Sequence, residues 1–375
     1  MTAASGLPML GTRTTVVVSS LAPGGAERAA VQVAAGLARR GRIVEVLTLR
    51  GDVADFYPVP AGVLRRRASA AATTDRRWWD VPGQTRRSAA LRRAIGDGAP
   101  DEVLSFTDLT NIAVLQAMVG SRVPVVVSEQ VDPRVVSIGR RWDLLRRSLY
   151  PTAARVVVPT HETAQWVARA RPRWKVAVAT NPLDPDALPT RAVRPPWFAE
   201  RNLIAMGRLT PQKGFDLLLP MFARLAEQHS AWALTIVGEG PERIALEEQV
   251  RRLGLTGRVH LVGLVNPPWP LLAAADLFAF PSRFEGFGNA LVEAMACGLP
   301  AVSFACPAGP AEILRPGVDG LLIPAGDLDG FEAGLAALMS DPDRRATMAA
   351  AAARVVDRFG IDAVTPAWEA ALRRT

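Results

Sequence analysis

The sequence predicts an α/β protein with two domains, each built on a parallel sheet with helices on both faces. Short apolar strand patterns alternate with longer helical patterns along the 375 residues. The alternation breaks once, over Asn181–Trp197, where five prolines in 17 residues favour an extended linker. Each half opens with a strand, a turn and a helix, in TTVVVSSLAPGGAERAAVQ and NLIAMGRLTPQKGFDLLL. Because ligands bind beyond the carboxyl ends of parallel strands, we expect a ligand in the cleft between the domains.

In the first half, a strand over Thr14–Ser19 is followed by an amphipathic helix over Ala26–Arg40. Residues 51–83, which carry Trp78 and Trp79, show neither the helical nor the strand pattern of apolar residues and are predicted to form long loops. Further strands are expected over Ile43–Leu49, Val103–Phe106, Val123–Val127, Arg155–Val158 and Val176–Thr180.

The second half repeats the alternation and closes with helical patterns. Helices are expected over Phe215–Gln228 and Glu242–Leu253, and then over Leu328–Met339, Arg344–Val356 and Ile361–Arg374. The expected strands are Asn202–Gly207, Ala233–Val237, Val259–Val262, Leu277–Phe280, Ala301–Phe304 and Leu321–Ile323.

Composition excludes several classes of protein. Hydrophobic residues make up 49% of the chain, which is enough for packed cores and excludes global disorder. The longest apolar stretches, such as Leu271–Phe280, fall short of the ~18 residues that a membrane span needs. We expect no signal peptide, and the two cysteines, Cys297 and Cys306, do not make a disulfide framework. A cytoplasmic protein is therefore expected.

The net charge of +8 is uneven along the chain. Residues 1–190 contain 26 Lys and Arg against 16 Asp and Glu, whereas residues 191–375 contain 18 against 20. A basic half is typical of proteins that meet nucleic acid, an anionic membrane or an anionic substrate, and also of a solubilising arginine-rich surface. The stretch Val135–Tyr150, with apolar residues among four arginines, is predicted either to lie on a membrane or to pack on the sheet as an ordinary helix.

The segment FPSRFEGFGNALVEAMACGLP, residues 280–300, carries the most specific chemical signal. It predicts a strand that ends at Phe280, a loop with two glycines, and a helix over Asn289–Cys297. Backbone N–H groups at such a helix N-terminus can bind a diphosphate. Glu285 and Glu293 flank these groups, and because carboxylates repel phosphate, hydroxyls are their expected partners. The combination is typical of a site for a sugar nucleotide.

Three other turns follow predicted strands. GRLTPQKGF, residues 207–215, places Arg208 and Lys213 where two cations can neutralise a diphosphate. LAPGGAERA, residues 21–29, is interpreted either as a close backbone approach to phosphate or substrate or as a tight turn. VGEGPER, residues 237–243, lacks the third glycine of the dinucleotide fingerprint.

This set of motifs resembles the family 4 retaining glycosyltransferases, which have the GT-B fold of two Rossmann-like domains facing across a cleft. The resemblance spans nearly the whole chain. The matching features are the Gly24–Gly25 loop, G-R-L-x-x-x-K-G over 207–214, G-x-G over 238–240, Glu285 and Glu293 in E-x7-E spacing, and CPAGPAEIL over 306–314.

The resemblance implies a domain division and a role for each matching residue. Residues 1–184 would bind the acceptor and residues 185–358 the nucleotide sugar, and residues 359–375 would form a helix that packs back toward the N-terminal domain. Glu285, Arg208 and Lys213 would act in catalysis. The donor site would comprise Gly25, Gly207, Arg208, Lys213, Gly238, Glu285, Gly286, Phe287, Gly288 and Glu293, with Glu293 on the ribose hydroxyls.

The acceptor side departs from the family pattern. Many members place a histidine after the strand that corresponds to Val123–Val127, and this chain has Gln130 there. A neutral amide cannot act as a base, so the role of Gln130 stays open and Glu129 is a further candidate. The acceptor-side candidates are Gly24, Glu129 and Gln130. In this family the departing phosphate is held to take the acceptor proton during same-face attack, so a protein base is not required.

The predicted function is a retaining, metal-independent bacterial glycosyltransferase of polysaccharide biosynthesis. It would move a hexose-type sugar from a UDP-sugar, which is a substrate rather than a cofactor, to a hydroxyl acceptor. That acceptor is either a lipid-linked glycan intermediate or a soluble secondary metabolite, and the cytoplasmic enzyme would contact the inner face of an anionic membrane in the first case. No metal site is expected, because HETAQ at 161–165 lacks the second histidine of a zinc motif.

Two other classes stay open as alternatives. A sugar-nucleotide epimerase can share this architecture and would turn over the sugar nucleotide without an acceptor. A nucleic-acid-binding protein would bind DNA or RNA in a salt-sensitive way, although the chain has no recognised nucleic-acid signature.

Overall fold

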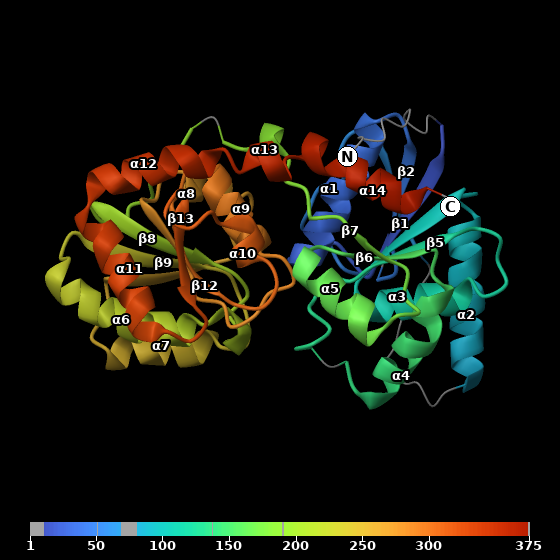
Figure 1. The fold of residues 1–375 in the computed structure, drawn as a ribbon, viewed down its shortest axis with the longest axis horizontal. Coiled ribbons are helices and arrows are strands. Elements are labelled where there is room, and N and C mark those ends of the chain that lie inside the picture. Colours follow the sequence, from blue (N-terminus) through green and yellow to red (C-terminus); the bar gives the residue numbers. More distant parts are fainter. Residues whose placement is uncertain (1–10, 51, 69–80, 137, 190, 374–375) are drawn as a thin grey trace. The chain divides into compact units, whose positions relative to one another are not determined.

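The computed structural model describes residues 11–50, 52–68, 81–136, 138–189 and 191–373. The chain forms two compact units (Figure 1): unit 1 comprises residues 1–182 and 361–375, and unit 2 comprises residues 183–360. Each unit is built on one parallel sheet with helices packed against it, so the predicted α/β class is confirmed.

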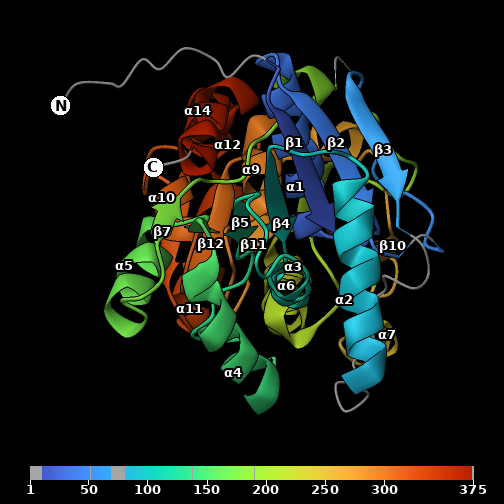
Figure 2. The ribbon, with the colours of Figure 1, turned by 90° about the vertical axis from the view of Figure 1, so that its right-hand side faces the viewer.

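Unit 1 contains a seven-stranded sheet in the order β3-β2-β1-β4-β5-β6-β7. The strand order reverses between β1 and β4, where parallel sheets of this kind open a crevice at their carboxyl ends. Figure 2 shows α2, α3 and α4 beside this sheet. The strands are β1 (Arg13–Val18), β2 (Ile43–Thr48), β3 (Val63–Arg67), β4 (Glu102–Phe106), β5 (Val125–Ser128), β6 (Arg155–Val158) and β7 (Val176–Val178). The helices are α1 (Gly25–Arg39), α2 (Val81–Gly96), α3 (Asp108–Ala117), α4 (Arg140–Leu149), α5 (His161–Ala170) and α14 (Ile361–Leu372), with a 3-10 turn at Tyr150–Thr152.

The prediction of long loops over residues 51–83 was wrong in part. Edge strand β3 lies inside that range and pairs with β2 in parallel. Its three consecutive arginines hide the strand pattern because charged side chains are typical of loops, but in the fold all three pair with carboxylates: Arg65 and Arg67 with Asp55, and Arg66 with Glu45. Trp78 and Trp79 lie outside the described residues.

Helix α14 packs on α1 and completes the core of unit 1. The Trp368 ring is fully buried and stacks on Phe106 at a centroid distance of 5.6 Å, and its Nε1 donates to the carbonyl oxygen of Thr180 at 2.8 Å. The two helices approach closely at Gly36, where a Cβ atom would lie 2.2 Å from Oγ1 of Thr365. The last helix therefore belongs to the same core as the first.

The basic stretch Val135–Tyr150 forms helix α4 over Arg140–Leu149. Ile138, Trp142, Leu145 and Leu149 pack against the core of unit 1, which agrees with the interpretation as an ordinary packed helix. Leu144 is 65% exposed and projects from the other side of α4.

Unit 2 contains a six-stranded sheet in the order β10-β9-β8-β11-β12-β13. Here the order reverses between β8 and β11. The strands are β8 (Arg201–Met206), β9 (Trp232–Val237), β10 (Val259–Gly263), β11 (Leu277–Phe280), β12 (Ala301–Ala305) and β13 (Gly320–Pro324). The helices are α6 (Phe215–Gln228), α7 (Arg243–Arg252), α8 (Trp269–Leu272), α9 (Asn289–Ala296), α10 (Pro310–Ile313), α11 (Leu328–Ser340), α12 (Pro342–Ala353) and α13 (Val356–Phe359), with 3-10 turns at Pro185–Ala187 and Pro211–Lys213.

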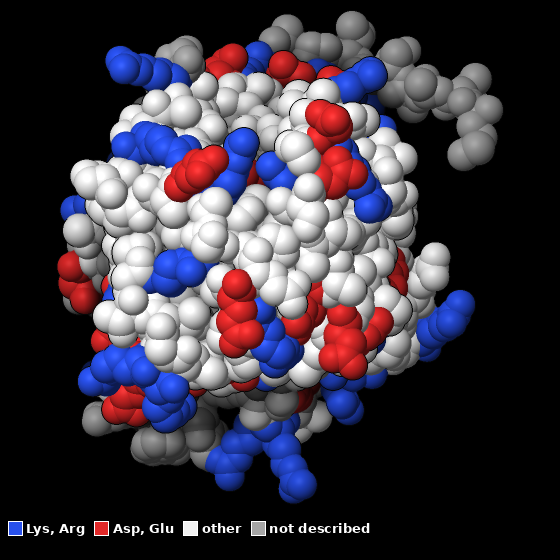
Figure 3. Space-filling view, turned by 90° about the vertical axis from the view of Figure 1, so that its left-hand side faces the viewer, with Lys and Arg blue, Asp and Glu red and all other residues white. Residues whose placement is uncertain are grey.

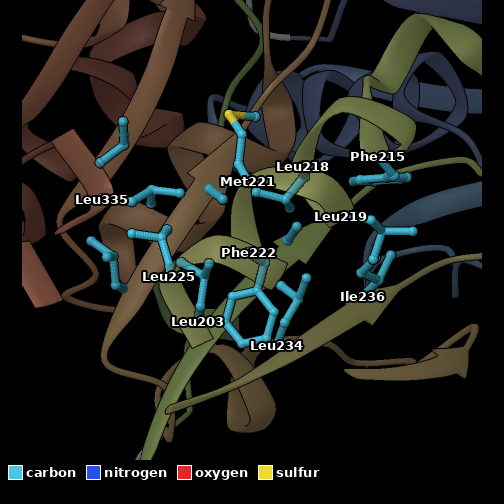
Figure 4. Close-up of a cluster of buried hydrophobic side chains, with 14 of the residues drawn as sticks. Leu203, Phe215, Leu218, Leu219, Met221, Phe222, Leu225, Leu234, Ile236 and Leu335 are labelled. Carbon is cyan, nitrogen blue, oxygen red and sulfur yellow. The ribbon is translucent and has the colours of Figure 1, made fainter. Parts of the chain in front are cut away.

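The main core of unit 2 lies between α6, α11 and the sheet (Figure 4). Leu218, Leu219 and Phe222 project from α6 toward Leu234 and Ile236 of β9, and all five side chains are fully buried. Burial of each such side chain contributes roughly 1.5–3 kcal/mol, so the sheet is a rigid base for the loops at its carboxyl edge. The face of this unit that Figure 3 shows mixes acidic and basic side chains, in keeping with the near-neutral balance of the second half.

In the part of the chain that the structure describes, no helix combines the length and apolarity needed to cross a bilayer.

Candidate functional site

The carboxyl ends of β8 and β11 define the candidate site in unit 2. These strands are neighbours at the point where the sheet order reverses. The loop after β8 contains residues 207–214 and the loop after β11 contains residues 281–288. A Cβ atom at Gly214, whose φ is +69°, would lie 2.0 Å from the carbonyl oxygen of Pro281, so the two loops touch through their backbones.

The cationic residues of the first loop have different environments. Arg208 is exposed, and no described residue forms a hydrogen bond or ion pair with its guanidinium. Lys213 donates from Nζ to Oε1 of Glu285 at 2.6 Å, and the two side chains are only 14% and 7% exposed. The Lys213 ammonium also lies 5.7 Å from the centroid of the Phe280 ring. The structure therefore brings together Lys213 and Glu285, which the sequence places far apart.

The second loop leads into helix α9. Gly288 is the N-cap of α9 with φ of +114°, and no side chain caps the helix there. An uncapped N-terminus of this kind presents backbone N–H groups and positive potential to an anion. Phe287 is 3% exposed, and Glu293 projects from α9 with 4% exposure. The helix ends at Ala296, one residue before the predicted end.

Two contacts that no sequence motif indicates join the loop after β11 to the start of α6 and to the loop after β8. Arg283 binds both carboxylate oxygens of Asp216, at 2.8 Å and 2.7 Å, and the Arg283 guanidinium holds the pKa of Asp216 below its ordinary value. Gln212 donates to the carbonyl oxygen of Phe284 at 2.9 Å. These residues carry no motif, because pairing of an arginine with an aspartate 67 positions away depends on the fold.

The glycine turn after β9 packs directly on the loop after β8. A Cβ atom at Gly238 would lie 1.9 Å from the carbonyl oxygen of Gly207, and one at Gly240 would lie 2.4 Å from that of Leu209. Beside this turn, Glu239 binds Arg243 in an ion pair. Because Gly238 and Gly240 lack Cβ atoms, the turn after β9 and the loop after β8 can pack closely.

In unit 1, the Gly24–Gly25 loop follows β1 and opens α1. Gly24 is extended, and its N–H donates to the hydroxyl of Tyr57 at 3.3 Å. The Glu27 carboxylate lies against Gly24, with Oε2 2.0 Å from the position of a Cβ atom. The Glu27 carboxylate therefore lies at the start of α1. Tyr57 supports the loop from a segment that the sequence analysis predicted only as loop.

The acceptor-side candidate Glu129 is fully buried at the end of β5. It accepts a hydrogen bond from the Tyr150 hydroxyl, and Arg146 Nη1 lies 3.8 Å from its Oε1. Burial raises the pKa of Glu129 from 4.5 to about 7, and the Arg146 charge opposes this shift. Asn111 donates to the Tyr150 hydroxyl at 3.1 Å, which completes a buried polar network.

Gln130, the neighbouring candidate, is half-buried. Its Nε2 donates to Oγ of Ser128 at 2.8 Å, and its Oε1 accepts from Nδ2 of Asn181 at 2.8 Å. The amide is therefore fixed by one hydrogen bond on each side. Gln130 is the more accessible of the two residues.

Across the described residues, no three or more His, Cys, Asp or Glu side chains gather in a way that could hold a metal ion.

Comparisons with known proteins place the chain in a family. The family described as Glycosyl transferases group 1 matches residues 200–341, and Glycosyltransferase Family 4 matches residues 23–187. The chain belongs to the family 4, group 1 glycosyltransferases and has the GT-B fold, which confirms the family and the fold that its motifs predicted.

Similar proteins act in the synthesis of glycans, as their names state. An exopolysaccharide phosphotransferase of Streptomyces coelicolor is 29% identical over 78% of this chain and 30% of its own length. The lipopolysaccharide core biosynthesis glycosyltransferase LpsE of Rhizobium meliloti is 34% identical over 44% of this chain and 48% of its own length. This chain thus spans less than half of either relative. A Campylobacter jejuni α-1,4-N-acetyl-D-galactosaminyltransferase, named for a diphospho-undecaprenol-linked glycan, is 25% identical over 94% of this chain and 96% of its own length.

Two solved structures share the fold over nearly the whole chain. Sucrose-phosphate synthase from Thermosynechococcus elongatus superposes with a TM-score of 0.82 at 19% identity, covering 96% of this chain and 98% of that one. Anabaena HepE, in complex with UDP and glucose, superposes with a TM-score of 0.77 at 22% identity and the same coverage.

Proposed function

We propose that this protein is a retaining, metal-independent glycosyltransferase that moves a hexose-type sugar from a UDP-sugar to a hydroxyl of a lipid-linked glycan. The observation that carries the proposal is the Lys213–Glu285 pair at the reversal of strand order in unit 2. Exposed Arg208 and the uncapped N-terminus of α9 complete this site. Two cations and a helix N-terminus suit a diphosphate, and the carboxylates of Glu285 and Glu293 suit hydroxyls.

The similar proteins support the choice of donor and acceptor. HepE has been solved with UDP and glucose, which favours a uridine nucleotide and a hexose. The Campylobacter relative that matches nearly the whole chain is named for an undecaprenol-linked acceptor, which favours a lipid carrier. Arg140, Arg141 and Arg147 are exposed on α4, and we propose that they contact an anionic membrane next to such an acceptor.

The chemistry follows from the charge that develops on the leaving group. The bond between the anomeric carbon and the diphosphate oxygen breaks, and the acceptor oxygen bonds to that carbon on the same face. The acceptor proton passes to the departing phosphate. Arg208, Lys213 and the α9 amides stabilise the negative charge of this leaving group, which is the largest catalytic contribution that the site offers.

Thermal unfolding with nucleotides tests the donor site. A ligand that binds only the folded protein raises its Tm, so UDP is expected to do so, with and without EDTA, whereas NAD is not. Lys213→Ala is expected to abolish the UDP shift. Lys175→Ala, which removes the only other lysine from an exposed position, is expected to keep it. A protein that responds to NAD alone, or to no nucleotide while it binds DNA, contradicts the proposal.

A transfer assay separates the proposed enzyme from an epimerase. A UDP-hexose and an undecaprenyl-diphosphate-linked glycan are expected to give UDP and an extended glycan with an α-linkage for an α-linked donor. Isomerisation of the UDP-hexose without acceptor would favour the epimerase instead.

A further inference from the structure

The loop over residues 285–288 is held by a strained turn that follows β12. Gly309 has φ of +114°, and a Cβ atom there would lie 1.6 Å from the carbonyl oxygen of Phe287. The preceding residue, Ala308, has φ of +58°, which is unusual for a residue with a side chain. The Glu285 N–H donates to the carbonyl oxygen of Pro307 at 3.2 Å. The turn therefore touches both ends of the peptide run from Glu285 to Phe287.

The aromatic ring of Phe287 is held by a second element. Its centroid lies 5.4 Å from that of Phe359 in an edge-to-face arrangement, and the two residues are 3% and 6% exposed. Phe359 ends α13, and the next residue, Gly360, is the last of unit 2. The Phe359 carbonyl accepts a hydrogen bond from the Leu183 N–H at 2.8 Å. Phe359 thus lies next to both ends of unit 2, which begins at Leu183 and ends at Gly360.

Arg358 links α13 to α10, the helix that follows the turn. Its Nη2 donates to the carbonyl oxygen of Ile313 at 2.6 Å, at the end of α10, and its guanidinium lies 5.0 Å from the Phe359 ring centroid. Helix α10 starts directly after Gly309, and a Cβ atom at Gly288 would lie 3.2 Å from Cδ1 of Ile313. We call Ala308, Gly309, Arg358 and Phe359 the loop support.

We infer that the loop support positions the donor-binding loop, and that Gly309 and Phe359 are positioning residues for the nucleotide sugar. This inference rests on the proposed function and deepens it. Backbone N–H groups and a carboxylate stabilise a developing charge only when they are fixed before the reaction. The buried Phe287 ring points to Phe359 rather than to solvent, so this aromatic residue anchors the loop. Neither Gly309 nor Phe359 needs to touch the donor.

A matched pair of phenylalanine variants tests the inference. Phe359→Leu removes the ring behind the loop. Phe331→Leu removes a fully buried ring whose centroid lies 4.5 Å from that of Phe304, in another hydrophobic cluster of the same unit. Both variants are expected to lower the Tm. Only Phe359→Leu is expected to raise the Kd for UDP and the KM for the UDP-sugar, by about tenfold, because misplaced contacts weaken binding and orientation together.

A pair of glycine variants gives a second, independent measurement. Gly309→Ala and Gly317→Ala both introduce a side chain at positive φ, and the backbone cost is the larger at Gly309, whose φ of +114° and ψ of −69° lie outside the left-handed region. The new methyl group meets the Phe287 carbonyl at position 309 and open space at position 317. Gly309→Ala is expected to weaken UDP binding about tenfold, and Gly317→Ala to leave it as in the wild type.

The outcomes separate this inference from the proposed function. If Phe359→Leu and Gly309→Ala lower the Tm but bind UDP like the wild type, the loop support is only structural and the inference is overturned. If wild-type protein shows no response to UDP, GDP or ADP, the proposed function fails and the inference fails with it. Weakened UDP binding in both variants and in neither control supports the inference.

Discussion

Nζ of Lys213 lies 2.6 Å from Oε1 of Glu285, although 72 positions separate the two residues. One follows β8 and the other follows β11, and these strands are neighbours in the sheet. Both side chains are largely shielded from water, so the pair is screened less than a surface ion pair. Glu285 therefore holds the ammonium in place, and under the proposed function a diphosphate would compete with Glu285 for it.

Glu285→Gln separates the two roles that this ion pair permits. Loss of the competing charge leaves the Kd for UDP unchanged or lower, whereas kcat falls about 100-fold because the sugar loses an ionised acceptor. Calorimetric titration with UDP and steady-state transfer kinetics measure the two effects. Glu248→Gln, an exposed change on α7, serves as the control for loss of a negative charge. UDP binding weakened as strongly as in Lys213→Ala would mean that Glu285 acts only by holding the lysine.

Glu129 makes stability depend on pH. Burial raises its pKa in the folded protein to about 7 from an ordinary value of 4.5, so the folded state binds the proton more tightly than the unfolded chain. The free energy of unfolding therefore falls as the pH rises from about 4.5 to about 7, by on the order of 3 kcal/mol. Glu129→Gln lacks this contribution and gains stability relative to the wild type as the pH rises.

Urea unfolding of wild type and Glu129→Gln at pH 5 and pH 8 measures this difference. Glu248→Gln, which changes an exposed side chain on α7, is the control variant for loss of a carboxylate. Parallel profiles for wild type and Glu129→Gln would show that Glu129 is ionised in the folded protein throughout this range.

Close packing of α14 on α1 sets the effect of Gly36→Ala. Alanine normally stabilises a helix interior by about 1 kcal/mol relative to glycine. At position 36, the new methyl group would meet Thr365 at 2.2 Å and Ile361 at 3.0 Å, so the Tm is expected to fall. Gly96→Ala on α2 meets open space and is expected to raise the Tm. Equal effects of the two changes on Tm would contradict this packing.

Removal of divalent cations with EDTA and their later addition test whether the transfer reaction is independent of a metal ion. Transfer activity is expected to be the same after dialysis against EDTA and after addition of Mg²⁺ or Mn²⁺, because in the proposed mechanism Arg208, Lys213 and the α9 amides would neutralise the diphosphate. A metal would otherwise supply several kcal/mol of this stabilisation. Activity that EDTA abolishes and Mg²⁺ restores would contradict the proposed mechanism.

The fold could be predicted from the sequence because the spacing of apolar residues differs between strands and helices and can be read within each segment. The pattern failed at β3, whose Arg65, Arg66 and Arg67 suggest a solvated loop. Their partners, Asp55 and Glu45, become neighbours only after β2 and β3 pair. Strand β3 therefore depends on tertiary contacts that local composition does not reveal.

The candidate site was predictable where it is encoded in contiguous motifs. Glu285, Gly288 and Glu293 share one strand–loop–helix segment, and Lys213 lies in another. The support around them was not predictable, because Arg283–Asp216 and Phe287–Phe359 join residues that are 67 and 72 positions apart in the chain. The burial of Glu129 likewise depends on Tyr150, which the fold brings to it from the end of α4.

A crystal structure determined with UDP would show whether the loops after β8 and β11 bind the diphosphate. We expect the diphosphate within hydrogen-bonding distance of Arg208, Lys213 and the backbone N–H groups that start α9, with the ribose hydroxyls on Glu293. Diphosphate bound elsewhere on the protein, or Lys213 still paired only with Glu285 while UDP occupies another site, would contradict it.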